Sequence, residues 1–188
     1  MRNVLTIRDR AAFRAWLAQY GQSEEECWVQ VKRGRPSKDG SFWYLDAVEE
    51  ALCFGWIDST TKAVDGVRYQ RFSPRREGSP WTELNKERVR RLIALGLLTP
   101  QGLAVAPPLG PRSFRPDPDV VAALKDARVW STFCTFPPLY RRVRLYNVAF
   151  YKERDPQVYR RALDHLVEET RAGRTYGEWN DYGRLLDY

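Results

Sequence analysis

The stretch WIDSTTKAVDGVRYQRFS, residues 56–73, decides the fold of this chain. Two short runs rich in β-branched and aromatic residues flank the pair Asp65-Gly66, which is a strong signal for a tight hairpin turn. Side chains alternate between the two faces of a strand, so Phe72 and Arg71 are expected on opposite faces. We therefore predict an antiparallel β-hairpin at the centre of the N-terminal half.

Helices are predicted on both sides of this hairpin. Apolar residues recur at three- and four-residue spacing over residues 6–20 and 44–56, and an alternating run at 27–33 predicts a further strand between them. The pair Ser79-Pro80 is typical of a helix N-cap followed by the first helical residue, which predicts a helix over 81–95.

The second half of the chain has a different composition. Residues 98–117 contain five prolines, which favours a surface linker without regular structure. Helical periodicity returns over residues 118–130, 137–152 and 156–172. The predicted fold class is α+β: a small antiparallel sheet with a β-hairpin packed by helices, followed by a helical C-terminal part. The predicted domains are 1–97, with 98–117 as linker, and 118–188.

Composition excludes several classes of protein. No run approaches the roughly 20 apolar residues of a membrane helix, and the first residues do not form a signal peptide, so we expect a cytoplasmic protein without membrane insertion. Cys27, Cys53 and Cys134 are scattered and form no CxxC pair, which predicts neither a disulfide framework nor a metal site. His165 stands alone, and no cofactor motif is present.

The net charge of +7 is unevenly distributed. Residues 59–91 carry nine Lys and Arg against four Asp and Glu, whereas residues 46–58 carry four acidic residues and no cation. A local basic excess of this kind suits a small anionic ligand. The adjoining acidic segment argues against a continuous track for nucleic acid, and no nucleic-acid-binding motif is found.

The basic residues gather in the stretch QRFSPRREGSPW, residues 70–81. Arginine forms planar, bidentate contacts with phosphates and carboxylates, and a helix N-terminus beside it adds unpaired N–H groups. The candidate ligand-binding residues are Arg68, Arg71, Arg75, Arg76, Ser79, Trp81 and Asn85.

Two interpretations use these same residues. In the first, the arginines bind an anion. In the second, they form ion pairs with Glu49, Glu50, Asp58 and Glu83 and hold the hairpin to its helices, with Asp58 as a partner of the hairpin arginines. An enzyme acting on a small phosphate- or carboxylate-bearing substrate at the same site is the alternative function. No residue pattern identifies a catalytic group.

Several segments resemble the YdeI/OmpD-associated family of small bacterial proteins. They are ALCFGWID at 51–58, QRFSPRR at 70–76, the spacing of Ser79, Trp81 and Asn85, and LTPQG at 98–102. The resemblance implies a role related to bacteriocin protection and supplies no catalytic residues. From the residues and the resemblance together, we expect a non-enzymatic, stress-related module that binds an anion or a partner.

Overall fold

The computed structural model describes all residues from Met1 to Tyr188. The chain forms two compact units, which are described separately below. The first contains Met1–Pro80 and Arg88–Pro107 together with Tyr188, and the second contains Trp81–Glu87 and Pro108–Asp187. The expected α+β class with a helical C-terminal part is confirmed.

The first unit is built on a four-stranded sheet. In chain order the strands are β1 (Val4–Leu5), β2 (Cys27–Gln30), β3 (Trp56–Val64) and β4 (Val67–Pro74), and their order across the sheet is β1-β2-β4-β3. The sheet was expected to be antiparallel, but β1 pairs in parallel with β2, so it is mixed. The two-residue strand β1 is too short for alternation to reveal it in the sequence.

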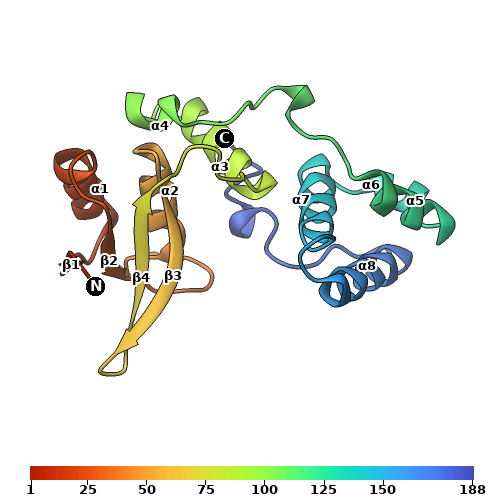
Figure 1. Cartoon of the computed structure of the whole chain (residues 1–188), viewed down its shortest axis with the longest axis horizontal. Helices are drawn as coiled ribbons and strands as arrows, with labels where there is room; N and C mark the ends of the chain where they lie inside the picture. The colour runs from red at the N-terminus through yellow and green to blue at the C-terminus, as the bar shows by residue number, and fades with distance from the viewer. The chain divides into compact units, whose positions relative to one another are not determined.

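The predicted hairpin is confirmed. Val64 pairs with Val67 across the turn, and Asp65 and Gly66 both have positive φ angles, 50° and 77°. These angles are those of a type I′ turn, whose twist matches that of the strands. Beyond the residues that pair with β2, the hairpin continues as a two-stranded arm, and its tip projects from the sheet in Figure 1.

Helices α1 (Arg10–Tyr20) and α2 (Tyr44–Cys53) contact each other and cover one face of this sheet. Phe72 of β4 is fully buried, and its ring lies 5.4 Å from that of Phe13 in α1. The first helix was expected from residue 6, but it begins at Arg10 because the Asp9 carboxylate accepts a hydrogen bond from the backbone N–H of Ala12.

The other two helices of the N-terminal half correct the sequence analysis. Helix α3 (Glu83–Ala94) begins later than expected, because the Thr82 hydroxyl accepts the hydrogen bond from the Asn85 backbone N–H. The Ser79-Pro80 pair therefore does not start it. The expected linker begins with helix α4 (Pro100–Ala104), which contacts α2. The linker also contains the short 3₁₀ helix η1 (Pro111–Ser113).

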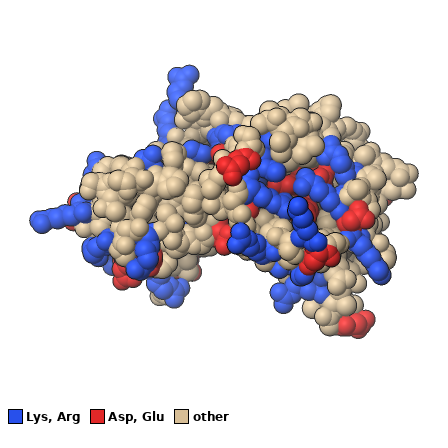
Figure 2. Space-filling view, turned by 180° about the vertical axis from the view of Figure 1, so that it is seen from behind, with Lys and Arg blue, Asp and Glu red and all other residues tan.

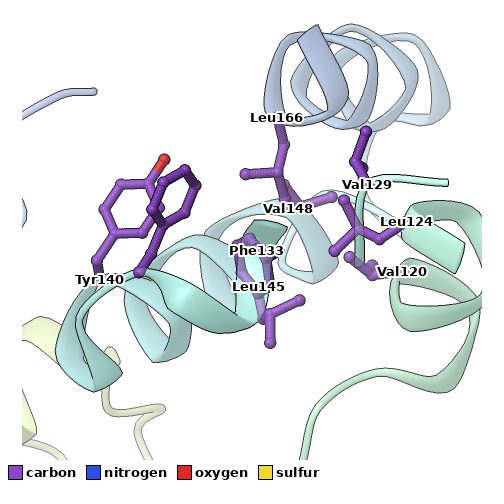
Figure 3. Close-up of a cluster of buried hydrophobic side chains, with 9 residues drawn as sticks. Val120, Leu124, Val129, Phe133, Tyr140, Leu145, Val148 and Leu166 are labelled. Atoms are coloured by element: carbon purple, nitrogen blue, oxygen red, sulfur yellow. The ribbon is translucent and has the colours of Figure 1, made fainter. Parts of the chain in front are cut away.

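The second unit is helical and encloses its own core. Four helices replace the three expected: α5 (Pro118–Asp126), α6 (Trp130–Thr135), α7 (Pro138–Ala149) and α8 (Pro156–Arg171). The break between α5 and α6 lies at Arg128, whose φ of 57° does not continue a helix. A short 3₁₀ helix, η2 (Asp181–Gly183), follows. Figure 3 shows Leu166 of α8 pointing toward side chains from the other helices. The buried cluster consists of Val120, Leu124, Val129, Phe133, Phe136, Tyr140, Leu145, Val148 and Leu166.

Helix α2 carries two neighbouring glutamates, which would ordinarily face solvent but are buried here. Glu49 and Glu50 are only 1% and 2% exposed. Arg10 of α1 donates to both carboxylates, at 2.9 Å and 2.5 Å. Arg14 donates to Glu50 at 2.7 Å and Arg91 of α3 to Glu49 at 2.8 Å. These ion pairs connect three helices, and none of them uses a hairpin arginine.

Candidate anion-binding site

Three of the segments singled out in the sequence meet at a small hollow in the first unit. They are the end of α2 with the start of β3, the end of β4, and helix α4. The hollow has a volume of about 170 Å³. Its lining residues are Leu17, Ala18, Gly21, Gln22, Phe54, Gly55, Trp56, Pro74, Arg75, Gln101 and Val105.

The segment at residues 99–102 is fixed to the end of α2 by one carbonyl group. The Cys53 carbonyl oxygen accepts hydrogen bonds from the Thr99 backbone N–H at 3.1 Å and from the Thr99 hydroxyl at 2.5 Å. A Cβ atom at Gly102 would collide with the same carbonyl oxygen. Glycine is therefore required at Gly102, and the close approach places Gln101 at the hollow.

The end of β4 is fixed in a similar way. Gly55 has a φ of 76°, a conformation that favours glycine, and its carbonyl accepts the backbone N–H of Arg75 at 2.9 Å. A Cβ atom on Gly55 would lie only 2.9 Å from the side chain of Val105. The turn at Gly55 thus sets the position of Arg75 relative to α4.

The opposite wall comes from the C-terminal end of α1. The indole N–H of Trp56 donates to the Gly21 carbonyl oxygen at 2.9 Å. The Trp56 ring lies edge-on to Trp16, with 5.7 Å between ring centroids. This hydrogen bond holds the end of α1 beside β3, so that Leu17 and Gln22 complete the lining.

Arg75 is the one charged side chain among the lining residues. One of its terminal nitrogens donates to the Pro80 carbonyl oxygen at 2.9 Å, which orients the guanidinium group. Gln22 and Gln101 add amide groups that can donate hydrogen bonds. The lining contains no carboxylate, so its charge favours an anion.

Arg71 has a structural role instead. It lies on the face of β4 opposite to Phe72 and donates to the Glu26 carboxylate at 2.6 Å. Hydrogen bonds from the Arg2 backbone N–H, the Trp28 indole and Arg71 lower the pKa of Glu26 to about 2. For Arg71, the structure matches the interpretation in which arginine supports the fold, with Glu26 as a partner that sequence reasoning missed.

The remaining candidate residues do not line the hollow. Arg68 and Arg76 are exposed, on β4 and in the loop after it. The Ser79 backbone N–H donates to the Arg76 carbonyl oxygen at 3.2 Å, which forms a turn and not a helix start. Trp81 and Asn85 belong to the second unit.

The other expected carboxylate partners also bind elsewhere. Asp58 accepts a hydrogen bond from the Tyr44 hydroxyl at 2.7 Å, because both side chains lie where α2 covers β3. Glu83 forms an ion pair with Lys86 at 2.6 Å. The pairing of Asp58 and Glu83 with the hairpin arginines, which the second interpretation proposed, is therefore not found.

The two buried cysteines and the single histidine show no arrangement typical of a catalytic group. Cys53 is fully buried, as expected, and burial raises the pKa of its thiol to about 11, with a further contribution from the Glu50 charge. Burial likewise raises the pKa of Cys27. His165 is exposed on α8, and its ring lies 4.3 Å from that of Tyr176. No group of His, Cys, Asp and Glu is arranged to hold a metal ion.

Sequence reasoning missed the residues that complete the hollow. Gln101 belongs to the LTPQG segment, and its place in that motif was the signal that could have identified it. Gln22 follows the end of α1 and carries no signal of its own, because only the fold brings it beside Arg75.

The fold is of the α+β class, and the hollow is its candidate site. The family model described as "Domain of unknown function (DUF8412)" matches residues 5–105, more than half of the chain. The chain therefore belongs to this family, and the matched range contains every residue that lines the hollow. No curated protein and no solved structure matches the chain.

None of the helices combines the length and the apolar character needed to cross a membrane.

Proposed function

We propose that this protein is a cytoplasmic, non-enzymatic module that binds a small anion, phosphate or carboxylate, in the hollow beside Arg75. The observation that carries the proposal is the composition of that hollow: one arginine, two glutamines and apolar side chains, with no carboxylate. A bound anion would accept hydrogen bonds from Arg75 and from the amide groups.

The size of the hollow limits the ligand. A drug-sized ligand needs a pocket of about 300–1,000 Å³. The hollow measures about 170 Å³, which is small for a nucleotide and sufficient for a single phosphate or a short carboxylic acid. Leu17, Phe54 and Val105 supply apolar contacts, which favours a carboxylate with a short carbon chain.

Binding is proposed in place of catalysis because of the side chains that line the hollow. A general acid, general base or nucleophile must reach the substrate within hydrogen-bond distance. The lining contains no His, Asp, Glu, Lys, Cys, Ser, Thr or Tyr. Cys53 directly precedes the lining residue Phe54, but the raised pKa of its thiol keeps it protonated at neutral pH.

Nucleic acid is a poor fit as the partner. Figure 2 shows one face of the molecule, on which acidic side chains lie among the basic ones. A single-strand binder combines a continuous basic groove with exposed aromatic rings. The interleaved charges instead favour a small anion at one position.

A relation to the YdeI/OmpD-associated family, with a role in stress protection, remains part of the proposal. It is supported by the way three of the four segments that carry the resemblance meet around the hollow. Residues 53–56, 74–75 and 99–102 belong to different motifs, yet hydrogen bonds from Arg75 and Thr99 join them. A binding site would explain why these segments occur together.

A thermal-shift series tests the proposal. The wild-type protein is heated with inorganic phosphate, sulfate and short mono- and dicarboxylates at low salt. At 100 times the dissociation constant, binding adds about 2.7 kcal/mol of stability. For a protein of this size that is a rise of roughly 5 to 10 °C in Tm. The rise should shrink as salt increases, because the contact is charge-assisted.

The matched variants are Arg75→Gln and Arg76→Gln. Arg76 is the adjacent arginine, but it is exposed and lies outside the hollow. We expect Arg75→Gln to lose the anion-induced rise and Arg76→Gln to keep it. A rise that survives in Arg75→Gln would place the site elsewhere, and no rise with any of these anions would refute the proposed function.

A further inference from the structure

A second hollow in the first unit is larger than the one beside Arg75 and shares no residue with it. Its volume is about 530 Å³, within the range of pockets that hold small-molecule ligands. Its lining residues are Ile7, Arg8, Gln30, Val31, Lys32, Gly40, Ser41 and Phe42.

The topology of the sheet explains why a hollow forms there. Strands β1 and β2 run in parallel, so their carboxyl ends, at Leu5 and Gln30, lie at the same edge. The chain leaves this edge in two directions, through residues 6–9 into α1 and through residues 31–43 into α2. Ligands commonly bind in the crevice outside the carboxyl ends of parallel strands, where the connecting loops diverge.

The charge of this hollow is positive. Arg8 is exposed and takes part in no ion pair, so its guanidinium group is available to a ligand. Lys32 donates to the Asp39 carboxylate at 2.5 Å, and its ammonium lies 4.6 Å from the centre of the Trp43 ring. These contacts hold Lys32 in place and leave two of its three N–H donors for a ligand.

The other lining side chains suit a hydroxylated carbon ring. Gln30 and Ser41 provide an amide and a hydroxyl group that can bond to hydroxyl groups. Ile7, Val31 and Phe42 provide apolar contacts for the carbon face of a ring. The two cations, by contrast, suit a phosphate group.

From this combination we infer that the hollow at the carboxyl ends of β1 and β2 is a second ligand site, which binds a sugar phosphate. Arg8 and Lys32 hold the phosphate, and Gln30 and Ser41 bond to the hydroxyl groups of the sugar. The site does not depend on the proposed function of the Arg75 hollow.

Isothermal titration with glucose 6-phosphate as the probe tests this inference. Wild-type protein should show saturable binding that weakens with increasing salt, whereas glucose without the phosphate should bind much more weakly. Arg8→Gln should weaken binding about tenfold or more, because a charge-assisted hydrogen bond is lost. Arg8 is exposed and lies between β1 and α1, so the variant should keep the wild-type circular dichroism spectrum and Tm.

Two controls make the result specific. Arg35→Gln changes an exposed arginine of the loop that leads into α2 but not the lining of the hollow, so it should bind as the wild type does. Arg76→Gln, which changes an exposed arginine outside both hollows, should also bind as the wild type does. No saturable binding of glucose 6-phosphate at millimolar concentration, or unchanged binding by Arg8→Gln, would overturn the inference.

Discussion

Replacing Glu49 by glutamine tests whether the buried ion pairs between α1, α2 and α3 hold the first unit together. The carboxylate is 1% exposed and accepts a hydrogen bond from Arg91 at 2.8 Å and another from Arg10 at 2.9 Å. Glutamine has nearly the same shape but no charge. Its amide has one carbonyl oxygen that can accept a hydrogen bond. The NH₂ group replaces the second oxygen and faces a guanidinium group that also donates.

The expected loss follows from these two contacts. A hydrogen bond to a charged group contributes about 1.5–3 kcal/mol. One of the two bonds is lost outright, and Arg10 and Arg91 are left partly buried with less compensating charge. Removing one partner of a buried ion pair costs about 3–5 kcal/mol. We therefore expect Glu49→Gln to lower the free energy of unfolding by about 3 kcal/mol.

Urea denaturation, followed by circular dichroism and by tryptophan fluorescence, measures this loss. Glu77→Gln is the matched control, because Glu77 is exposed in the loop after β4 and forms no ion pair. The free energy of unfolding of Glu77→Gln should stay within about 0.5 kcal/mol of the wild-type value. If Glu49→Gln is as stable as the control, the buried ion pairs do not support the fold, and the physical account of α2 is wrong.

Three further outcomes are expected. Only Cys134 is exposed, so a thiol reagent at neutral pH should label one thiol quickly and the other two after unfolding, and Cys134→Ser should abolish the fast phase. Glu26, whose pKa is lowered to about 2 foremost by the Arg2 backbone N–H, stabilises the fold above its unfolded pKa of about 4.3. That contribution is lost as the pH falls from about 4.3 to 2, so Glu26→Gln should flatten this limb of the acid-denaturation curve; an unchanged limb would contradict the assigned hydrogen bonds. Gly102→Ala should cost about 1–3 kcal/mol in urea denaturation, whereas Gly110→Ala, which meets open space, should cost little, and equal effects would refute the close approach of α4 to α2.

The hairpin and the positions of the main helices could be predicted because local residues determine them. Asp65-Gly66 specifies the turn by its tolerance of positive φ, and the alternation around Phe72 specifies the faces. Helix boundaries were harder to predict, since a nearby capping group decides them. The Thr82 hydroxyl starts α3, although Ser79-Pro80 matches the sequence signal more closely.

The candidate site was predicted only in part, for a similar reason. Arg75 was among the expected ligand-binding residues, and the structure places it in a hollow. Its partners in the lining come from α1 and α4, and no local pattern links Gln22 or Gln101 to an arginine more than 25 residues away. The partner of Arg71 is Glu26, which β2 brings beside β4 only through the sheet register.

Isothermal titration of inorganic phosphate and short carboxylates into wild-type protein, Arg75→Gln and Arg76→Gln tests the central claim most directly. At low salt we predict that at least one of these anions binds the wild type and Arg76→Gln with equal affinity, and that it binds Arg75→Gln at least tenfold more weakly. This difference corresponds to the loss of about 1.4 kcal/mol of binding free energy. Equal binding by all three proteins, or no binding to the wild type, would contradict an anion site beside Arg75.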